Sequence, residues 1–92
     1  MAYASKNLKL VAGETWLPDT PCIWSYASAD AIATVRVDGY MSDAKYRGMK
    51  VGDLVYVYDS ATPTAQLCLV ITVAETGADL ANGTSISVTN SD

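Results

Sequence analysis

The chain has 92 residues, half of them hydrophobic, and its ten acidic and six basic side chains give a net charge of −4. This length predicts one small domain that buries roughly 60–65% of its unfolded surface. The chain contains no run of about 18 apolar residues, and its scattered basic residues form no stripe for nucleic acid phosphates. We therefore expect neither a membrane nor a nucleic acid as a partner.

Residues 1–21 are expected to form an extended N-terminal arm, followed by a single β-domain over residues 22–92. Gly13, Pro18 and Pro21 interrupt any long periodic element in the arm. Its apolar side chains, which are costly to expose, include Tyr3, Leu8, Leu10, Trp16 and Leu17. Two alternatives remain open: the arm folds back as an edge strand and lid on its own domain, or it lies on a neighbouring subunit. The arm lacks the pattern of a secretory signal, which predicts synthesis in a cytoplasm.

Six segments are expected to be strands, because they are rich in β-branched and aromatic residues or alternate between apolar and polar side chains. In chain order they are Leu8–Val11, Ile23–Tyr26, Ile32–Val37, Leu54–Tyr58, Gln66–Val73 and Thr84–Thr89. The first two have the weakest pattern. Short or moderate turns separate the strands, which predicts an antiparallel meander, whereas a parallel sheet would need crossover helices.

One helical turn is expected between the third and fourth of these strands. Ser42 is placed to cap it, Asp43–Arg47 would form it, and Gly48 would supply a left-handed stop. The turns Asp38–Gly39 and Val51–Asp53 come before and after it.

Both faces of Leu54–Tyr58 and Gln66–Val73 are apolar, so these strands are expected to be central and covered on both sides. The residues between them are consistent with an antiparallel hairpin, and Glu75–Gly83 is expected to connect to an outer last strand. The predicted fold class is all-β and mainly antiparallel: a small β-barrel or sandwich with one short helical turn and the N-terminal arm. The two apolar faces also predict self-association.

The sequence contains no histidine, which removes Ser-His, Cys-His and most catalytic zinc arrangements. Several aspartates lie where a strand ends or a helix starts, which favours turn formation and capping over acid–base catalysis. They are Asp30, Asp38, Asp43, Asp53 and Asp59. No phosphate-binding glycine motif is present. We therefore expect a protein that is not an enzyme and that binds no cofactor or metal.

The two cysteines, Cys22 and Cys68, lie far apart and without metal-ligand spacing. They are expected to be small buried hydrophobic residues, with a disulfide between them as the alternative.

The aromatic residues give the remaining interface candidates. Trp16 and Trp24 each combine a large apolar surface with an N–H group, which suits a partly wet interface, with core packing as the alternative. Tyr56 and Tyr58 lie on one face of the fourth predicted strand. These tyrosines complete the set of candidate interface residues.

A family resemblance is carried by residues 30–73. There a predicted strand with Thr34-Val35 is followed by Gly39-Tyr40, a helical turn at Asp43-Ala44, the turn Val51–Asp53 and the strand Leu54–Tyr58. This order resembles small structural proteins of tailed-bacteriophage virions, among them capsid decoration (cement) proteins and head-fibre modules. The resemblance implies a non-enzymatic virion component that is commonly trimeric.

The function that follows from this resemblance is a decoration protein on the outer capsid surface, made in the cytoplasm of the bacterial host. Its expected partners are the major capsid protein and further copies of itself, without nucleic acid. Alternatives are a tail or fibre-base module, and a binding barrel of the SH3-like or oligonucleotide-binding type. A hydrolase that uses carboxylates alone is the remaining possibility.

Overall fold

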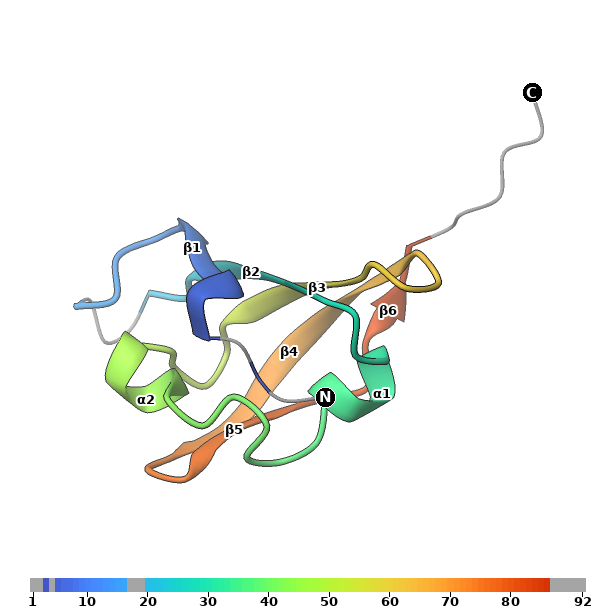
Figure 1. Ribbon diagram of the computed structural model, residues 1–92. Helices are drawn as coiled ribbons and strands as arrows, with labels where there is room; N and C mark the ends of the chain where they lie inside the picture. Colours follow the sequence, from blue (N-terminus) through green and yellow to red (C-terminus); the bar gives the residue numbers. More distant parts are fainter. Residues whose placement is uncertain (1–2, 4, 17–19, 87–92) are drawn as a thin grey trace.

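The structure is a computed structural model that describes residues 3, 5–16 and 20–86. Its helical elements are a 3-10 turn η1 and two one-turn helices, α1 and α2, which lie on the same side of a twisted sheet (Figure 1). In chain order the elements are η1 (Ser5–Asn7), β1 (Leu8–Ala12), β2 (Ile23–Ser28), α1 (Ile32–Val35), α2 (Ala44–Arg47), β3 (Leu54–Asp59), β4 (Thr64–Ala74), β5 (Gly77–Leu80) and β6 (Thr84–Ser85). Strands dominate, which confirms the predicted all-β class.

The sheet has the strand order β1-β2-β3-β4-β5, and β6 pairs with β4 beyond the end of β5. All pairs are antiparallel except β2 and β3, which run parallel over their full length. The sheet is therefore mixed, and the predicted meander is wrong between these two strands. The described residues also form no closed barrel, because β1 stands at one edge of the sheet while β5 and β6 form the other.

The parallel pair arises because the segment expected to be the strand Ile32–Val37 is helical instead. Its first four residues form α1, in which Ile32 and Val35 are buried while the two residues between them are exposed. Two apolar residues three positions apart share one face of a helix, whereas a strand would bury alternate residues. With α1 and α2 in the connection, β2 can cross over to a parallel β3. Tertiary packing thus overrides the β propensity of this segment.

Helix α2 lies where the helical turn was expected, but its start differs from the prediction. The residue at its N-terminal cap is Asp43, not Ser42, and no side chain there bonds to the free N–H groups. Gly48 ends the helix in the left-handed conformation with φ +96°, which confirms its predicted role. A Cβ atom on Gly48 would lie 2.5 Å from the Thr15 Cβ, so glycine also allows the β1–β2 loop to approach.

The hairpin β3–β4 is confirmed, and the side chain of Asp59 holds its turn by accepting hydrogen bonds from Ala61 N and Thr62 Oγ1, each at 2.9 Å. Residues 75–83, which were expected to form only a connection to the last strand, contain β5. In β5, Ala78 and Leu80 are buried on either side of the half-buried Asp79. Within the described part of the last predicted strand, only Thr84–Ser85 is strand. Residues 87–89 of that prediction lie outside the described residues.

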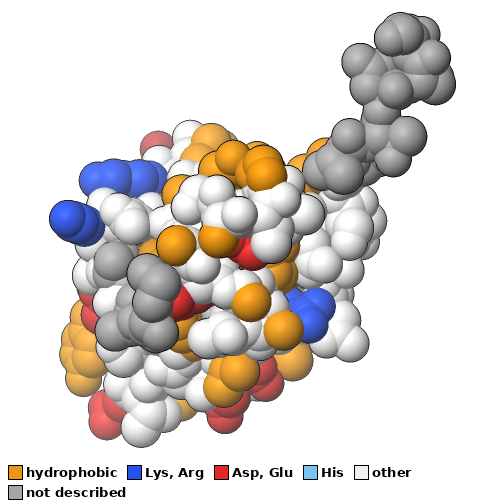
Figure 2. Space-filling view, turned by 45° about the vertical axis from the view of Figure 1, so that its right-hand side comes forward, with side chains coloured by type: hydrophobic (Ala, Val, Ile, Leu, Met, Phe, Trp, Pro, Cys, Tyr) orange, Lys and Arg blue, Asp and Glu red, His pale blue; other side chains and the backbone are white. Residues whose placement is uncertain are grey.

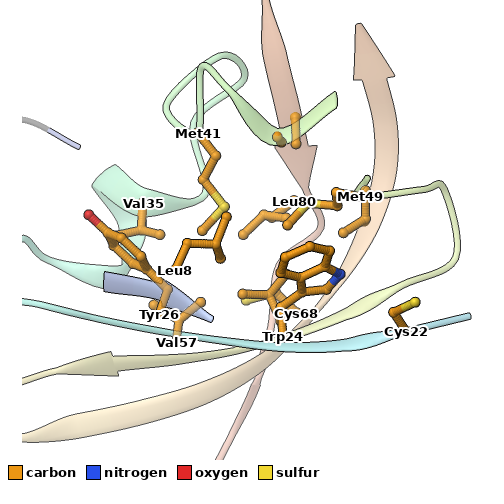
Figure 3. Close-up of a cluster of buried hydrophobic side chains, with 14 of the residues drawn as sticks. Leu8, Cys22, Trp24, Tyr26, Val35, Met41, Met49, Val57, Cys68 and Leu80 are labelled. Carbon is orange, nitrogen blue, oxygen red and sulfur yellow. The ribbon is translucent and has the colours of Figure 1, made fainter. Parts of the chain in front are cut away.

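The core lies between the helices and the side of the sheet that faces them (Figure 3). Leu8, Trp24, Tyr26, Val57 and Cys68 enter it from the strands. Val35, Met41 and Met49 enter it from the α1–β3 connection. Cys22 and Cys68 are both buried free thiols, as expected, and burial raises the pKa of the Cys68 thiol.

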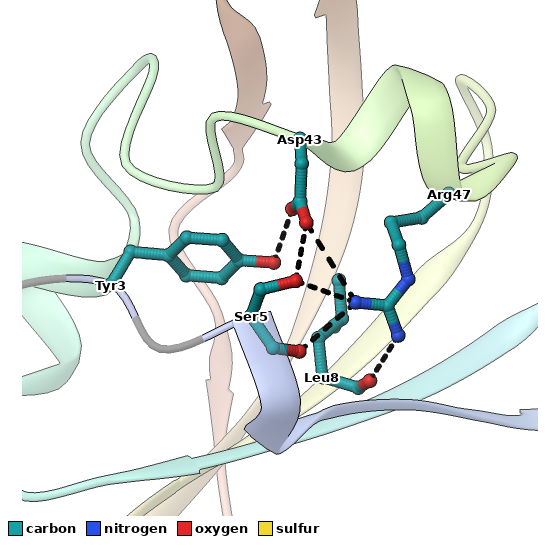
Figure 4. A network of polar contacts seen from close by, with 5 residues as sticks. All are labelled: Tyr3, Ser5, Leu8, Asp43 and Arg47. Carbon is teal, nitrogen blue, oxygen red and sulfur yellow. Dashed lines mark hydrogen bonds and ion pairs between the residues drawn. The ribbon is translucent and has the colours of Figure 1, made fainter.

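Tyr3 and residues 5–12 are held against this core, as the first of the two alternatives for the arm requires. Leu8 is fully buried, and β1 pairs with β2 as an edge strand. A polar network beside it joins Tyr3 and Ser5 to Asp43 and Arg47 (Figure 4). Arg47 also donates to the carbonyl of Leu8 at 2.5 Å. Tyr3 and residues 5–12 therefore belong to the same domain as the sheet.

Candidate functional site

The side of the sheet that faces away from the helices is an open, largely apolar surface. The pairing register aligns its side chains in rows across β2, β3 and β4: Ile23, Leu54 and Leu69 in one row, and Ser25, Tyr56 and Leu67 in the next. A third row contains Ala27, Tyr58 and Ala65. Ile86 extends this third row, because its N–H donates to the carbonyl of Ala65 at 3.0 Å. We call this surface the open face.

The side chains of the open face remain well exposed although they belong to the central strands. Seven large apolar residues are each 36–45% exposed: Ile23, Leu54, Tyr56, Leu67, Leu69, Ile71 and Ile86. Ile71 belongs to this set because it continues the alternation of Leu67 and Leu69 along β4, and the register shift between Val70 and Thr72 leaves Thr72 exposed next to it. The exposed area of these seven residues is roughly 550 Å², near the upper end of the largest apolar patches on typical monomers.

A shallow groove of about 660 Å³ adjoins this face at the end of β1, β2 and β3. Tyr56 and Tyr58 form its apolar side, and Lys6 and Lys9 bring positive charge to its other side. Its remaining lining is mostly small, with Ser25, Ala27, Ser28 and Ser60 among it. The described lining of the groove contains no Asp or Glu side chain.

A second exposed apolar surface lies at the free edge of β1 and in the loop that follows. Leu10, Val11 and Trp16 are 42%, 61% and 73% exposed. In the part of the chain that the structure describes, β1 pairs only with β2, so its outer edge is open for another strand. An edge of this kind with apolar side chains nearby can accept an extended segment of a partner by main-chain hydrogen bonding.

The residues predicted for an interface divide into three groups. Tyr56, Tyr58, Leu10 and Trp16 do lie on the two surfaces just described. Leu8 and Trp24, by contrast, are 0% and 2% exposed and belong to the core, and Tyr3 packs against that core. Leu8 and Trp24 therefore present no free surface to a partner, which corrects their place in the predicted set, while Tyr3 is half-buried. Leu17 lies outside the described residues.

The aliphatic residues of the open face were not among the predicted interface residues, although the sequence contains a signal for them. Leu67, Leu69 and Ile71 alternate with Cys68 and Val70, which shows a strand with two apolar faces. The sequence does not show that helices cover only one of these two faces.

The most buried carboxylate of the described residues holds two strands together. Asp53 is fully buried and accepts hydrogen bonds from Cys22 N, Trp24 Nε1 and Lys50 N at 2.9, 2.9 and 3.0 Å. The Lys50 ammonium lies 4.0 Å from the Oδ1 atom of this carboxylate. Both of its oxygens thus serve to join the beginning of β2 to the beginning of β3, as the expected turn role requires.

A tyrosine cluster lies at the opposite end of the core. The rings of Tyr3, Tyr26 and Tyr40 pack together with centroids 5.5–5.9 Å apart. Burial raises the pKa of Tyr40, and its hydrogen bonds to Asp30 and Tyr26 raise it further. The Tyr40 hydroxyl proton is therefore held firmly, which suits packing and not proton transfer near neutral pH.

The charged side chains form no continuous site. On the face shown in Figure 2, Lys and Arg stand in separate places and not in a stripe. Among residues 3, 5–16 and 20–86, no group of three or more Cys, Asp or Glu side chains is arranged to hold a metal ion. In the same residues no helix is long and apolar enough to cross a membrane.

Comparison with protein-family models, curated proteins and solved structures finds no match for this chain. The open face and the β1 edge are the two exposed apolar surfaces found among the described residues.

Proposed function

We propose that this chain is a non-catalytic structural protein of a tailed-bacteriophage virion, a decoration protein that binds the major capsid protein on the outer surface of the head. The proposal is supported by the resemblance of residues 30–73 and by one structural observation. That observation is the 73% exposure of Trp16 in the loop that follows β1, a strand whose outer edge has no partner among the described residues.

An exposed tryptophan is unusual on a protein that has no partner, because its large apolar surface stays in water. Tryptophan is also among the residues that most often dominate the binding energy of interfaces. Leu10 and Val11, exposed on β1, extend the apolar surface along the strand. We propose that an extended segment of the capsid protein pairs with β1 and places an apolar pocket over Trp16.

A rigid domain fixed in this way would stabilise the particle mechanically. Contacts that span two capsid subunits are lost when the subunits separate, so a bound decoration protein raises the free energy needed to separate them. The acidic net charge of −4 keeps the unbound protein soluble before it reaches the particle.

The test is the incorporation of variants into particles of the phage that encodes the chain. Trp16→Ala should reduce the copy number per major capsid protein, measured by quantitative mass spectrometry, at least about tenfold, since hot-spot truncations cost on the order of 2 kcal/mol. Val37→Ala is the control, because Val37 is 56% exposed and lies close to Gly39, which bonds to β5 at the opposite edge of the sheet from β1. Its copy number should equal that of the wild type.

Deletion of residues 1–17 is not a suitable variant, because it would remove β1 and the buried Leu8. Absence of the wild-type protein from purified particles would contradict the virion function. Presence at only a few copies per particle would instead indicate a tail or fibre-base position. Normal incorporation of Trp16→Ala would contradict the β1 edge as the docking site.

A further inference from the structure

We infer that the open face binds the open face of a second copy of this chain, so that two sheets pack face to face around a two-fold axis. This inference concerns a different surface from the β1 edge and goes beyond the proposed virion function. It also explains why the sequence predicts strands that are covered on both faces, although the described residues form a single sheet.

The first argument is the area of the face. Its seven large apolar residues are only 36–45% exposed as single side chains, but together they leave roughly 550 Å² of apolar surface in contact with water. With the smaller and polar residues around them, the face reaches the order of 800 Å² that one partner contributes to a standard stable interface. The open face is therefore large enough for a specific dimer.

The second argument is the regularity of the face. Its rows cross three neighbouring strands in register, so they form the ridged surface that another sheet can cover at a distance of about 10 Å. A helix or an irregular loop would match these rows less well. The same rows on a second copy supply a surface of the required shape, and a two-fold axis brings like residues together.

The third argument is the placement of charge. The three rows across β2, β3 and β4 contain no charged residue, so bringing two copies together buries no unpaired charge and opposes no like charges at the centre. The charged neighbours lie at the two rims: Lys9 on β1 and Asp79 on β5. The charged side chains thus stay outside the apolar centre of the face, at its polar rim.

The groove gives the fourth argument. Tyr56 and Tyr58, which form its apolar side, belong to the same rows. A second sheet would cover both rings and reduce the groove to a polar channel between Lys6, Lys9 and the serines of its lining. An apolar centre with a polar, hydrated rim is the usual anatomy of a stable interface.

The test uses one matched pair of substitutions in the full chain. Tyr56→Lys places an ammonium group in the centre of the open face, while Tyr46→Lys makes the same change on the exposed surface of α2. By sedimentation equilibrium, the wild type and Tyr46→Lys should have about twice the chain mass of 9.7 kDa at micromolar concentration. Tyr56→Lys should weaken the dimer at least about 30-fold, because burying a charge there costs 2 kcal/mol or more.

A second measurement keeps the inference falsifiable if Tyr56→Lys does not fold. Leu67→Cys carries a thiol on the open face and Tyr46→Cys carries one on α2, and both native cysteines are buried. A short bismaleimide should join two copies of Leu67→Cys into a covalent dimer, whereas Tyr46→Cys should stay uncoupled.

Other results would overturn the inference. They are a strictly monomeric wild type at about 100 μM, a trimer, or a dimer that Tyr56→Lys leaves unchanged while it remains folded. Each of these is read in solution without particles, so failure of the dimer and failure of the virion function are distinguishable.

Discussion

Asp53 illustrates how one side chain determines the geometry of two strands. Its carboxylate satisfies two main-chain N–H groups and the indole N–H of Trp24, all inside a core that excludes water. A buried donor that loses its acceptor keeps the full cost of its desolvation. The sequence suggested a turn aspartate at this position, but a buried carboxylate with three donors can be recognised only from the structure.

Asp53→Ala should therefore lower the free energy of unfolding by about 3 kcal/mol or more, because three donors and the Lys50 ammonium lose their partner at once. Chemical denaturation followed by circular dichroism measures the change. Asp38→Ala is the control, since Asp38 is exposed and its removal should change the free energy by less than about 0.5 kcal/mol. Equal effects of the two substitutions would show that the buried carboxylate has no such role.

Asp43 gives the protein a pH-dependent contact between the start of the chain and α2. Burial opposes ionisation of this carboxyl, but hydrogen bonds from Ser5 and Tyr3 and the charge of Arg47 outweigh it and lower its pKa. A carboxyl whose pKa is lowered on folding adds stability above its unfolded value of about 4 and loses it as the pH falls through the lower folded value.

The free energy of unfolding of Asp43→Asn should therefore fall below that of the wild type by on the order of 1 kcal/mol at pH 6, and this gap should close as the pH drops below about 4. Urea denaturation at a series of pH values measures the gap. The exposed Asp38→Asn should show no such gap at pH 6. A gap for Asp43→Asn that persists unchanged at pH 2 would refute the assignment.

At the scale of elements, β5 is held in place by a close contact between two main chains. Gly77 begins the strand with φ +140°, and a Cβ atom there would lie 2.7 Å from the Cα of Gly39. Next to this contact Met41 pairs with Ala78 in a β-bridge. The segment after α1 thus packs on the edge of the sheet, which carries the chain across to α2.

Gly77→Ala should lower the free energy of unfolding by about 2 kcal/mol or more, since the main chain of Gly39 must move away. Gly52→Ala is the control, because it measures the cost of a positive φ without a close contact. Gly52 has φ +97°, and a Cβ atom there would meet nothing within 4 Å. Its cost should be about 1 kcal/mol. If both variants melt at the same temperature, the close approach does not contribute.

At the scale of the whole molecule, the helices α1 and α2 cover one side of the sheet and leave the other open. A chain of 92 residues has few elements with which to cover both sides of a six-stranded sheet. As a consequence, the outward rows of β2, β3 and β4 stay exposed, and so does Trp16 in the loop after β1. The two proposals assign these surfaces to different partners, a second copy and a capsid subunit.

Local patterns in the sequence predicted much of this fold. The strands β1 to β4, the helix stop at Gly48 and the buried thiols Cys22 and Cys68 each depend on the chemistry of a few neighbouring residues. Alternation, turn propensity and the conformational freedom of glycine act over short distances, so the sequence shows them directly.

Only the tertiary structure decided whether Ile32–Val35 is a strand or a helix, because its β-branched residues fit both until the buried face is known. That choice made β2 and β3 parallel and set both helices on one side of the sheet. It also decided which apolar residues become core, as Trp24 does, and which remain exposed, as Leu69 does. Burial depends on contacts between residues far apart in the chain, and no local pattern contains that information.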